Sequence, residues 1–313
     1  MSPPQPNGTI HMSTNKMAAD PSTSEPVSKK ARTGEGLVST WPKFTHRMDQ
    51  DEVKTFFKET GYIKVTDFLS EDELTALNRE LTRYRRDVVP NIANKDVFYE
   101  EKDNPDTIIR LERMQTNDNF FKDLGHSPAF NGLADLLLGE DMEPNNVQFF
   151  SKPPGAKPTP PHQDGKYFMH DKGITFWLAL DDADEENGCL YYVPGTHLMG
   201  ELQHEKSAAL GFSQGLADYS AEMQEKEACM AAKKGNTTMA EKEVCMAVKK
   251  GSLLGHHPYT VHRAGKNSSP TRWRPALGLT YWAKSCQHDE ELKRRHKEYQ
   301  QKLLEELENK GRI

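Results

Sequence analysis

The sequence has few cysteines, no long apolar run and no excess of positive charge. Its four cysteines form no CxxC pair, so a zinc-finger framework is unsupported. The N-terminus carries no apolar signal-peptide core, and we therefore expect reduced thiols in an intracellular protein. The cysteines are Cys189, Cys229, Cys245 and Cys286.

The chain is acidic overall, with a formal net charge of −6 and a pI of about 6.1. No basic field favours nucleic acid as a partner. No apolar run approaches the ~18 residues that span a bilayer, so no membrane span is expected. We expect a cytoplasmic protein. A peroxisomal or nuclear location stays open: the C-terminus is not a peroxisomal tripeptide, whereas Lys29–Arg32 is a candidate nuclear signal.

Apolar residues are also scarce, at 35% of 313 residues, and the shortage is uneven. Residues 1–42 are rich in Pro, Ser, Thr and Asn without apolar periodicity, which predicts a disordered tail. Residues 43–286 form the predicted folded domain, with a polar loop-and-helix insertion at about 201–243 that we expect to act as a lid. Residues 287–313 predict a charged helix whose thin apolar stripe packs on the domain.

The folded part opens with a predicted helix–strand–helix unit. A helix from about Met48 ends at Gly61, and Tyr62–Val65 is typical of a short strand. Ser70 and Glu73 form a capping box that opens the second helix. The buried face of that helix carries Leu74, Leu77, Leu81 and Tyr84.

From about Asn145 to Ala283, short apolar runs alternate with turn dipeptides such as Asn187-Gly188. This pattern is typical of a β-sandwich or barrel, so the expected fold class is mainly β with flanking helices. The runs are Val147–Phe150, Ile174–Leu180, Leu190–Val193, Val244–Val248, Ser252–Leu254 and Ala276–Trp282.

The segment Pro161-His162-Gln163-Asp164 is the first half of a candidate metal site. In a strand, residues i and i+2 point to the same face, so His162 and Asp164 would aim at one point. Two imidazoles and one carboxylate make the facial triad that binds Fe(II) and leaves coordination positions open. A lone His-x-Asp triplet is common by chance, so the assignment needs a second half.

The second half lies far along the chain, where His262 is followed by Arg272 and Arg274. His262 supplies the second imidazole. A guanidinium presents a planar fork that meets a carboxylate with two hydrogen bonds. A buried arginine therefore implies an anionic partner, here a dianionic acid.

These motifs resemble the phytanoyl-CoA dioxygenase family, which includes phytanoyl-CoA and ectoine hydroxylases. The likeness covers roughly Met48 to Ala283. The resemblance implies a double-stranded β-helix, a jelly-roll core related to the cupins. Three runs carry it most clearly: Trp177-Leu178-Ala179-Leu180-Asp181-Asp182, Glu186-Asn187-Gly188-Cys189-Leu190 and Pro194-Gly195-Thr196-His197.

The resemblance also implies roles for particular residues. Arg274 matches the position that binds the distal carboxylate of 2-oxoglutarate, and Lys152 and Trp177 match positions that line its pocket. The implied cofactors are Fe(II), the co-substrate 2-oxoglutarate and O2. The residues that match the metal ligands are His162, Asp164 and His262.

Two positions depart from the family pattern. Arg274 lies one residue further from the distal histidine than expected, so Arg272 competes with it for the carboxylate. Ala264 stands where family members usually place a serine that helps to hold the carboxylate. Thr280, Tyr167 or a water molecule are candidates for that role.

Other residues near the motifs allow both a functional and a packing interpretation. Tyr167, Phe168 and His170 follow the first metal motif and are candidates to line the substrate site, with ordinary aromatic packing as the alternative. His256 and His257 precede the distal histidine and are expected to pack in their strand.

The resemblance implies a 2-oxoglutarate-dependent dioxygenase that hydroxylates a C–H bond of a small-molecule or acyl substrate, an acyl-CoA included, and releases succinate and CO2. Retention of Asp164 disfavours halogenation, while desaturation or cyclisation stays open. The first alternative is a catalytically weak or inactive relative that acts as a sensor or scaffold. A zinc hydrolase with the same ligands is disfavoured by the carboxylate-binding arginine. No pattern indicates the oligomeric state.

Overall fold

The computed structural model describes residues 49–101, 104–209, 212–216 and 243–292, with isolated positions up to 305. The predicted disordered tail lies outside the described residues, as does most of the predicted insertion. The helices are α1 (Gln50–Thr60), α2 (Glu71–Arg83), α3 (Met114–Asn117), α4 (Asn119–Gly125), α5 (Phe130–Leu138) and α6 (Gly165–Phe168). The strands are β1 (Tyr62–Val65), β2 (Val97–Tyr99), β3 (Ile108–Leu111), β4 (Met142–Lys152), β5 (Thr159–His162), β6 (Gly173–Ala179), β7 (Leu190–Tyr192), β8 (His204–Ala209), β9 (Phe212–Leu216), β10 (Val244–Met246), β11 (Leu253–His256), β12 (His262–Ala264) and β13 (Arg274–Ala283).

The predicted helix–strand–helix unit at the start of the domain is confirmed as α1, β1 and α2. Gly61 ends α1 in the left-handed conformation, with φ of 77°, and its N–H donates to the carbonyl of Phe57. A side chain at Gly61 would also collide with the ring of His197. Ser70 and Glu73 form the reciprocal capping box that begins α2.

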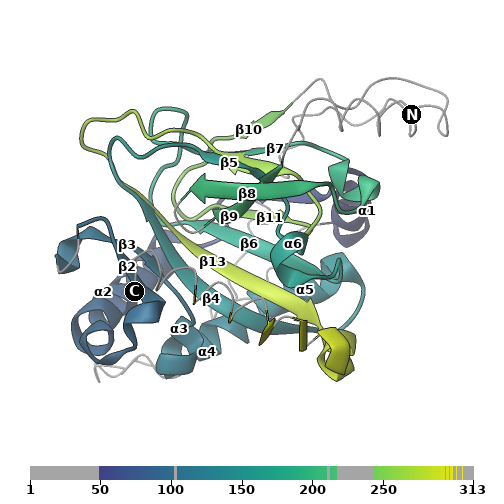
Figure 1. The fold of residues 1–313 in the computed structure, drawn as a ribbon, viewed down its shortest axis with the longest axis horizontal. Helices are drawn as coiled ribbons and strands as arrows, with labels where there is room; N and C mark the ends of the chain where they lie inside the picture. Colours follow the sequence, from purple (N-terminus) through teal and green to yellow (C-terminus); the bar gives the residue numbers. More distant parts are fainter. Residues whose placement is uncertain are drawn as a thin grey trace, which may run out of the picture.

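Two antiparallel sheets form the centre of the molecule (Figure 1). The larger has seven strands in the order β1-β11-β6-β13-β4-β3-β2, and the smaller has four in the order β10-β7-β12-β5. Apart from β4, β3 and β2, neighbouring strands in both sheets are not consecutive in the chain, as in a jelly roll. The expected fold class, mainly β with flanking helices around a jelly-roll core, is confirmed.

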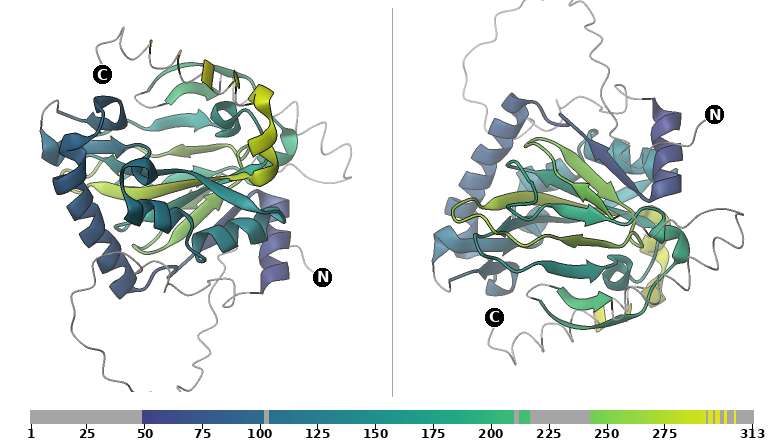
Figure 2. Two further views of the ribbon diagram at one scale, coloured as in Figure 1. Left: turned by 90° about the horizontal axis from the view of Figure 1, so that it is seen from below. Right: turned by 90° about the horizontal axis from the view of Figure 1, so that it is seen from above.

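The two faces of the larger sheet pack against different parts of the molecule. Leu277, Leu279 and Tyr281 of β13 point outward and pack with the buried side chains of α1, α2, α4 and α5. Each fully buried Leu or Phe in such a layer contributes about 1.5–3 kcal/mol, and this cluster holds more buried apolar residues than the one on the inner face. Figure 2 shows α1 and α2 toward opposite ends of the strands.

The inner face of the larger sheet looks toward the smaller sheet. Ala276 of β13, Trp177 of β6 and Leu254 of β11 share one cluster with Tyr192 of β7 and Ala264 of β12. Because side chains alternate along a strand, residues two positions from these also face inward. The space between the sheets is therefore where inward polar side chains meet.

The predicted loop-and-helix insertion is wrong for its first part. Strands β8 and β9 pair as a two-stranded hairpin that lies against β5. The polar composition of this segment led to the expectation of loop and helix. A strand pair at the surface can also be polar, because its outer face contacts water. At the other end of the domain, Leu292 is buried and helical, as the C-terminal stripe predicts. The rest of that stripe lies outside the described residues.

Among the described residues, no helix is long and apolar enough to cross a membrane.

Candidate metal centre and co-substrate site

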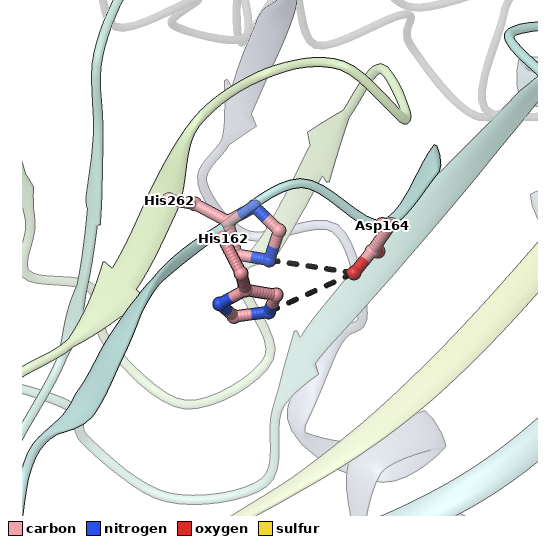
Figure 3. Close-up of side chains that lie close together, drawn as sticks. All are labelled: His162, Asp164 and His262. Atoms are coloured by element: carbon pink, nitrogen blue, oxygen red, sulfur yellow. Dashed lines mark ion pairs between the residues drawn. The ribbon is translucent and has the colours of Figure 1, made fainter. Parts of the chain in front are cut away.

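Two histidines and one aspartate meet between the sheets. Candidate ligand atoms of His162, Asp164 and His262 all lie within 4.8 Å of one another. Oδ1 of Asp164 is 3.8 Å from Nε2 of His162 and 3.6 Å from Nε2 of His262. Figure 3 shows both rings turned toward the carboxylate. We call these three residues the metal end of the site; two neutral imidazoles and one carboxylate are a donor set that suits Fe(II).

Strand pairing brings the two histidines together. His162 ends β5 and His262 begins β12, and the two residues are directly opposite in the antiparallel register. Their ring centroids are 4.2 Å apart. Nδ1 of each ring lies 2.9 and 3.0 Å from the carbonyl oxygens of Pro160 and Thr260, respectively. These hydrogen bonds leave Nε2 of both rings for a metal.

Asp164 does not lie in the strand, so the expectation that it shares a strand face with His162 is wrong. Its backbone is α-helical, with φ of −64° and ψ of −28°, and it precedes the short helix α6. Its carbonyl oxygen accepts the N–H of Tyr167 and of Phe168. The chain turns immediately after His162, and this turn brings the carboxylate back toward both rings.

Burial sets the protonation states of the metal end. Burial lowers the pKa of His162, and burial together with the neighbouring rings holds the pKa of His262 well below its ordinary value. Burial alone would raise the pKa of Asp164, but the surrounding histidine rings and the hydrogen bond from His256 leave it below its ordinary range. Neutral imidazoles and an ionised carboxylate are the forms that bind a metal ion.

The second carboxylate oxygen of Asp164 has partners that sequence reasoning missed. Nε2 of His256 lies 3.0 Å from Oδ2, and Oγ1 of Thr175 donates to the same oxygen at 2.6 Å. Nδ1 of His256 in turn lies 2.9 Å from the hydroxyl of Tyr192. We expected His256 only to pack in its strand. Strand alternation from Leu254 places its side chain on the inner face, but no sequence signal points it at Asp164.

Gln163 links the metal motif to the surrounding loops. It is fully buried, and its side-chain amide donates to the carbonyls of Gly200 and Tyr259. Its side-chain oxygen accepts the N–H of Leu202. Its backbone N–H donates to Nε2 of His204, the first residue of β8. The middle residue of the motif therefore fixes the position of the β8–β9 hairpin beside the metal end.

Lys152, Trp177 and Arg274 gather on the same inner face, and we call them the cationic end of the site. Arg274 and Lys152 are directly opposite on β13 and β4. The Arg274 guanidinium carbon lies 5.0 Å from the centre of the Trp177 ring. Arg274 is 6% exposed, and within the described part of the chain its Nε and Nη1 have no hydrogen-bond acceptor.

Two buried cations without an anion are electrostatically costly. Burial lowers the pKa of Lys152 to about 7, with a further contribution from Arg274, and burial lowers the pKa of Arg274 to about 10. Both shifts report a region that disfavours positive charge in the absence of a partner. A bound carboxylate would reverse the penalty and satisfy the guanidinium.

Arg272 lies outside this region. Its guanidinium pairs with Asp184 at 2.8 Å and Glu186 at 3.0 Å, and its side chain is 39% exposed. A single residue separates the two arginines in the chain, yet of the two only Arg274 has unsatisfied donors in the described interior. The arrangement therefore favours Arg274 over Arg272 as the carboxylate-binding residue.

The candidates to replace the missing serine at Ala264 are placed differently. Thr280 is six residues from Arg274 on β13, a separation of about 20 Å in an extended strand. It pairs with Thr175 and accepts a hydrogen bond from Asn145. Thr280 therefore does not reach the Arg274 guanidinium. Lys152, directly opposite Arg274, is the second cation available there.

The aromatic candidates separate into two groups. Tyr167 lies beside the metal end, with its ring centroid 6.3 Å from that of His162. Phe168 and His170 instead pack on Trp282, at centroid distances of 5.8 and 4.7 Å. His170 lines a surface pocket with residues of the C-terminal segment such as Arg295, and that pocket includes no residue of the metal end.

A jelly roll with a two-histidine-one-carboxylate cluster and a buried arginine on its facing sheets defines a class of metal-binding β-barrel proteins. The chain belongs to the phytanoyl-CoA dioxygenase family. The sequence profile of that family, described as Phytanoyl-CoA dioxygenase (PhyH), matches residues 57–276, well over half of the chain. The resemblance inferred from the motifs is confirmed.

Individual relatives are distant. The chain is similar to a probable alpha-ketoglutarate-dependent hypophosphite dioxygenase of Stutzerimonas stutzeri, with 25% identity over 70% of this chain and 73% of that protein. It is 22% identical to the peroxisomal phytanoyl-CoA dioxygenase of Rattus norvegicus, over 79% of this chain and 73% of the relative.

Among solved structures, the epimerase SnoN in complex with Fe3+, alpha ketoglutarate and nogalamycin RO superposes with a TM-score of 0.58. It is 20% identical, and the match covers 75% of this chain and 83% of that one. This likeness supports the jelly-roll fold.

Proposed function

We propose that the protein is a 2-oxoglutarate-dependent non-haem iron dioxygenase, with His162, Asp164 and His262 as the iron ligands. The observation that carries the proposal is the buried Arg274, whose Nε and Nη1 have no acceptor in the described interior. A metal site alone would fit several chemistries. A metal site and an unsatisfied guanidinium that lie on facing sheets of one barrel fit a dianionic co-substrate.

Each part of the site has a task in this reaction. Bound iron supplies the activation of O2 and the oxidation of the substrate C–H bond, with 2-oxoglutarate converted to succinate and CO2. Arg274 and Lys152 bind the distal carboxylate, and the Trp177 ring closes the pocket beside the guanidinium. His162, Asp164 and His262 would hold the metal and would leave coordination positions for 2-oxoglutarate and O2.

The prime substrate is proposed to be a small molecule or an acyl compound, acyl-CoA included, that is hydroxylated at carbon. The named relatives act on compounds as different as phytanoyl-CoA and hypophosphite. We propose that the β8–β9 hairpin forms the wall that selects the substrate, because His204 attaches it to Gln163 of the metal motif. Loops and hairpins at such positions commonly determine specificity.

A catalytically weak relative that senses or scaffolds is the second candidate. Its support is Ala264, which replaces the serine that helps to hold the carboxylate in most family members. Lys152 beside Arg274 offers a second contact to the same carboxylate and so favours the enzyme. A zinc hydrolase is disfavoured, since hydrolysis of a neutral substrate does not need two buried cations.

The decisive experiment needs no knowledge of the prime substrate. Fe(II) and 2-oxoglutarate are added to the purified protein without oxygen, and the visible charge-transfer band of the iron–2-oxoglutarate complex is recorded. We expect a band that is absent in His162→Ala and that needs far more 2-oxoglutarate in Arg274→Ala. Arg272→Ala is the matched control and should titrate as the wild type does.

The opposite results are equally informative. No band despite normal iron binding would mean that Ala264 has removed co-substrate binding, and the sensor or scaffold interpretation would then lead. An unchanged band in His162→Ala would reject the proposed ligand set.

A further inference from the structure

Asp164 has two carboxylate oxygens with different surroundings. Oδ1 points at the two histidine rings, 3.8 and 3.6 Å from their Nε2 atoms. Oδ2 accepts hydrogen bonds from Oγ1 of Thr175 at 2.6 Å and from Nε2 of His256 at 3.0 Å. One oxygen therefore faces the metal end, while the other is held by protein groups.

The direction of the hydrogen bond between His256 and Asp164 follows from the chemistry of the acceptor. A carboxylate only accepts, so Nε2 of His256 must carry the proton of this hydrogen bond. Nδ1 of that ring shares a second hydrogen bond with the hydroxyl of Tyr192, across 2.9 Å. Tyr192 is completely buried and His256 is 2% exposed, so solvent does not compete for these contacts.

The three partners are fixed by strand pairing in both sheets. Thr175 on β6 is directly opposite His256 on β11 in the larger sheet. Tyr192 on β7 is directly opposite His262 on β12 in the smaller sheet. The chain of hydrogen bonds from Tyr192 through His256 to Asp164 consequently crosses from one sheet to the other and ends on a proposed ligand.

We propose that Thr175, His256 and Tyr192 are positioning residues that hold Asp164 as a ligand through Oδ1 alone. This inference rests on the proposed function. Two donors occupy Oδ2, so turning it toward the metal would break both hydrogen bonds and leave buried polar groups unsatisfied. A carboxylate that bound through both oxygens would occupy one of the positions that 2-oxoglutarate and O2 need.

The test measures metal binding, not turnover. The probe is Co(II) alone, whose visible absorption reports coordination number, added to the full chain and to Thr175→Val, Tyr192→Phe and His256→Phe. Loss of a hydrogen bond to a ligand typically weakens metal affinity by about 10- to 100-fold. We expect about 10-fold for Thr175→Val and for Tyr192→Phe, about 100-fold for His256→Phe, and a changed Co(II) spectrum in all three.

Thr280→Val is the matched control. Thr280 pairs with Thr175 on the neighbouring strand and faces the same way, but it bonds Asn145 and not Asp164. It should keep wild-type affinity and spectrum. Thr175→Val and Tyr192→Phe preserve side-chain shape, so the test stands even if His256→Phe fails to fold.

Two failures are distinguishable. If the wild-type protein binds no Co(II), the result contradicts the proposed function, and the positioning role falls with it. If the wild type binds Co(II) but Thr175→Val and Tyr192→Phe match Thr280→Val in affinity and spectrum, only the positioning role is overturned.

Discussion

The metal end and the cationic end lie on facing sheets of one barrel, yet they differ in how far the protein satisfies their polar groups. The metal end has hydrogen-bond partners within the protein, whereas the cationic end has donors without acceptors in the described interior. At the metal end, Oδ2 of Asp164 has two hydrogen-bond partners, and Nδ1 of His162 and of His262 has a carbonyl partner. At the cationic end, Arg274 has unsatisfied donors, and burial lowers the pKa of Lys152 to about 7.

This contrast indicates two strategies for preorganisation. The metal end orients its proposed ligands through hydrogen bonds to protein groups, so its geometry is built into the fold. The cationic end keeps its charges poorly compensated and gains most when an anion arrives, which favours a dianion over neutral competitors. Substitutions at the two ends should therefore have separable effects.

Replacing the carboxylate ligand should have the largest effect. Asp164→Ala is expected to weaken Fe(II) affinity by at least about 100-fold, since loss of a ligand should exceed the 10- to 100-fold cost of losing an outer hydrogen bond. Metal competition and 2-oxoglutarate-dependent succinate formation measure it. Asp182→Ala, which removes a surface carboxylate bonded to Lys249, is the control. Near-normal iron binding by Asp164→Ala would contradict the proposed ligand set.

Arg274→Met should weaken 2-oxoglutarate binding on the order of 100-fold, because a buried charge pair that loses one partner costs about 2–5 kcal/mol. Iron binding should stay near wild type, which separates the two ends. The free energy of unfolding without ligand should be unchanged or higher, since an uncompensated buried charge has been removed.

Arg272→Met provides the comparison for this prediction. Its partly exposed ion pairs with Asp184 and Glu186 are worth little, about 0–1 kcal/mol of stability, and 2-oxoglutarate affinity should not change. Titration calorimetry of both variants decides between the two arginines. If Arg272→Met were the weaker binder, the assignment would be reversed.

Lys152→Met should weaken 2-oxoglutarate binding by about 10-fold at pH 6, where the lysine is charged. The pKa of Lys152 is about 7 without ligand, so wild-type affinity should fall as the pH rises above that value and the cation is lost. The variant should show a much flatter profile over the same range. An identical pH dependence in both proteins would exclude Lys152 as the titrating group.

The smallest effect concerns stability without ligand. The pKa of Lys152 is lowered from 10.5 to about 7 on folding, so between these values the unfolded chain holds a proton that the native protein has released. Stability should therefore rise with pH across this window, by a few °C in Tm, and less so in Lys152→Met. Thermal unfolding followed by circular dichroism at pH 7 and pH 9.5 measures it.

Local signals made the beginning of the domain predictable. Gly61 ends a helix because only glycine takes the left-handed conformation at low cost, and Ser70 with Glu73 begins one by capping it. The hairpin β8–β9 was missed for the opposite reason: its polar residues have no periodicity of their own, and its position depends on contact with β5.

The candidate site divides in the same way. The residue types that could bind iron and 2-oxoglutarate were predictable from the sequence, because donor chemistry and motif resemblance depend only on which residues occur and in what order. Three features depended on the tertiary structure. Asp164 lies at the start of α6, where the chain turns its carboxylate toward the histidines, and His256 forms a hydrogen bond with that carboxylate. Arg274 is buried, whereas Arg272 is partly exposed. Those outcomes depend on which strands become neighbours, and strand pairing between distant segments is not encoded in any local pattern.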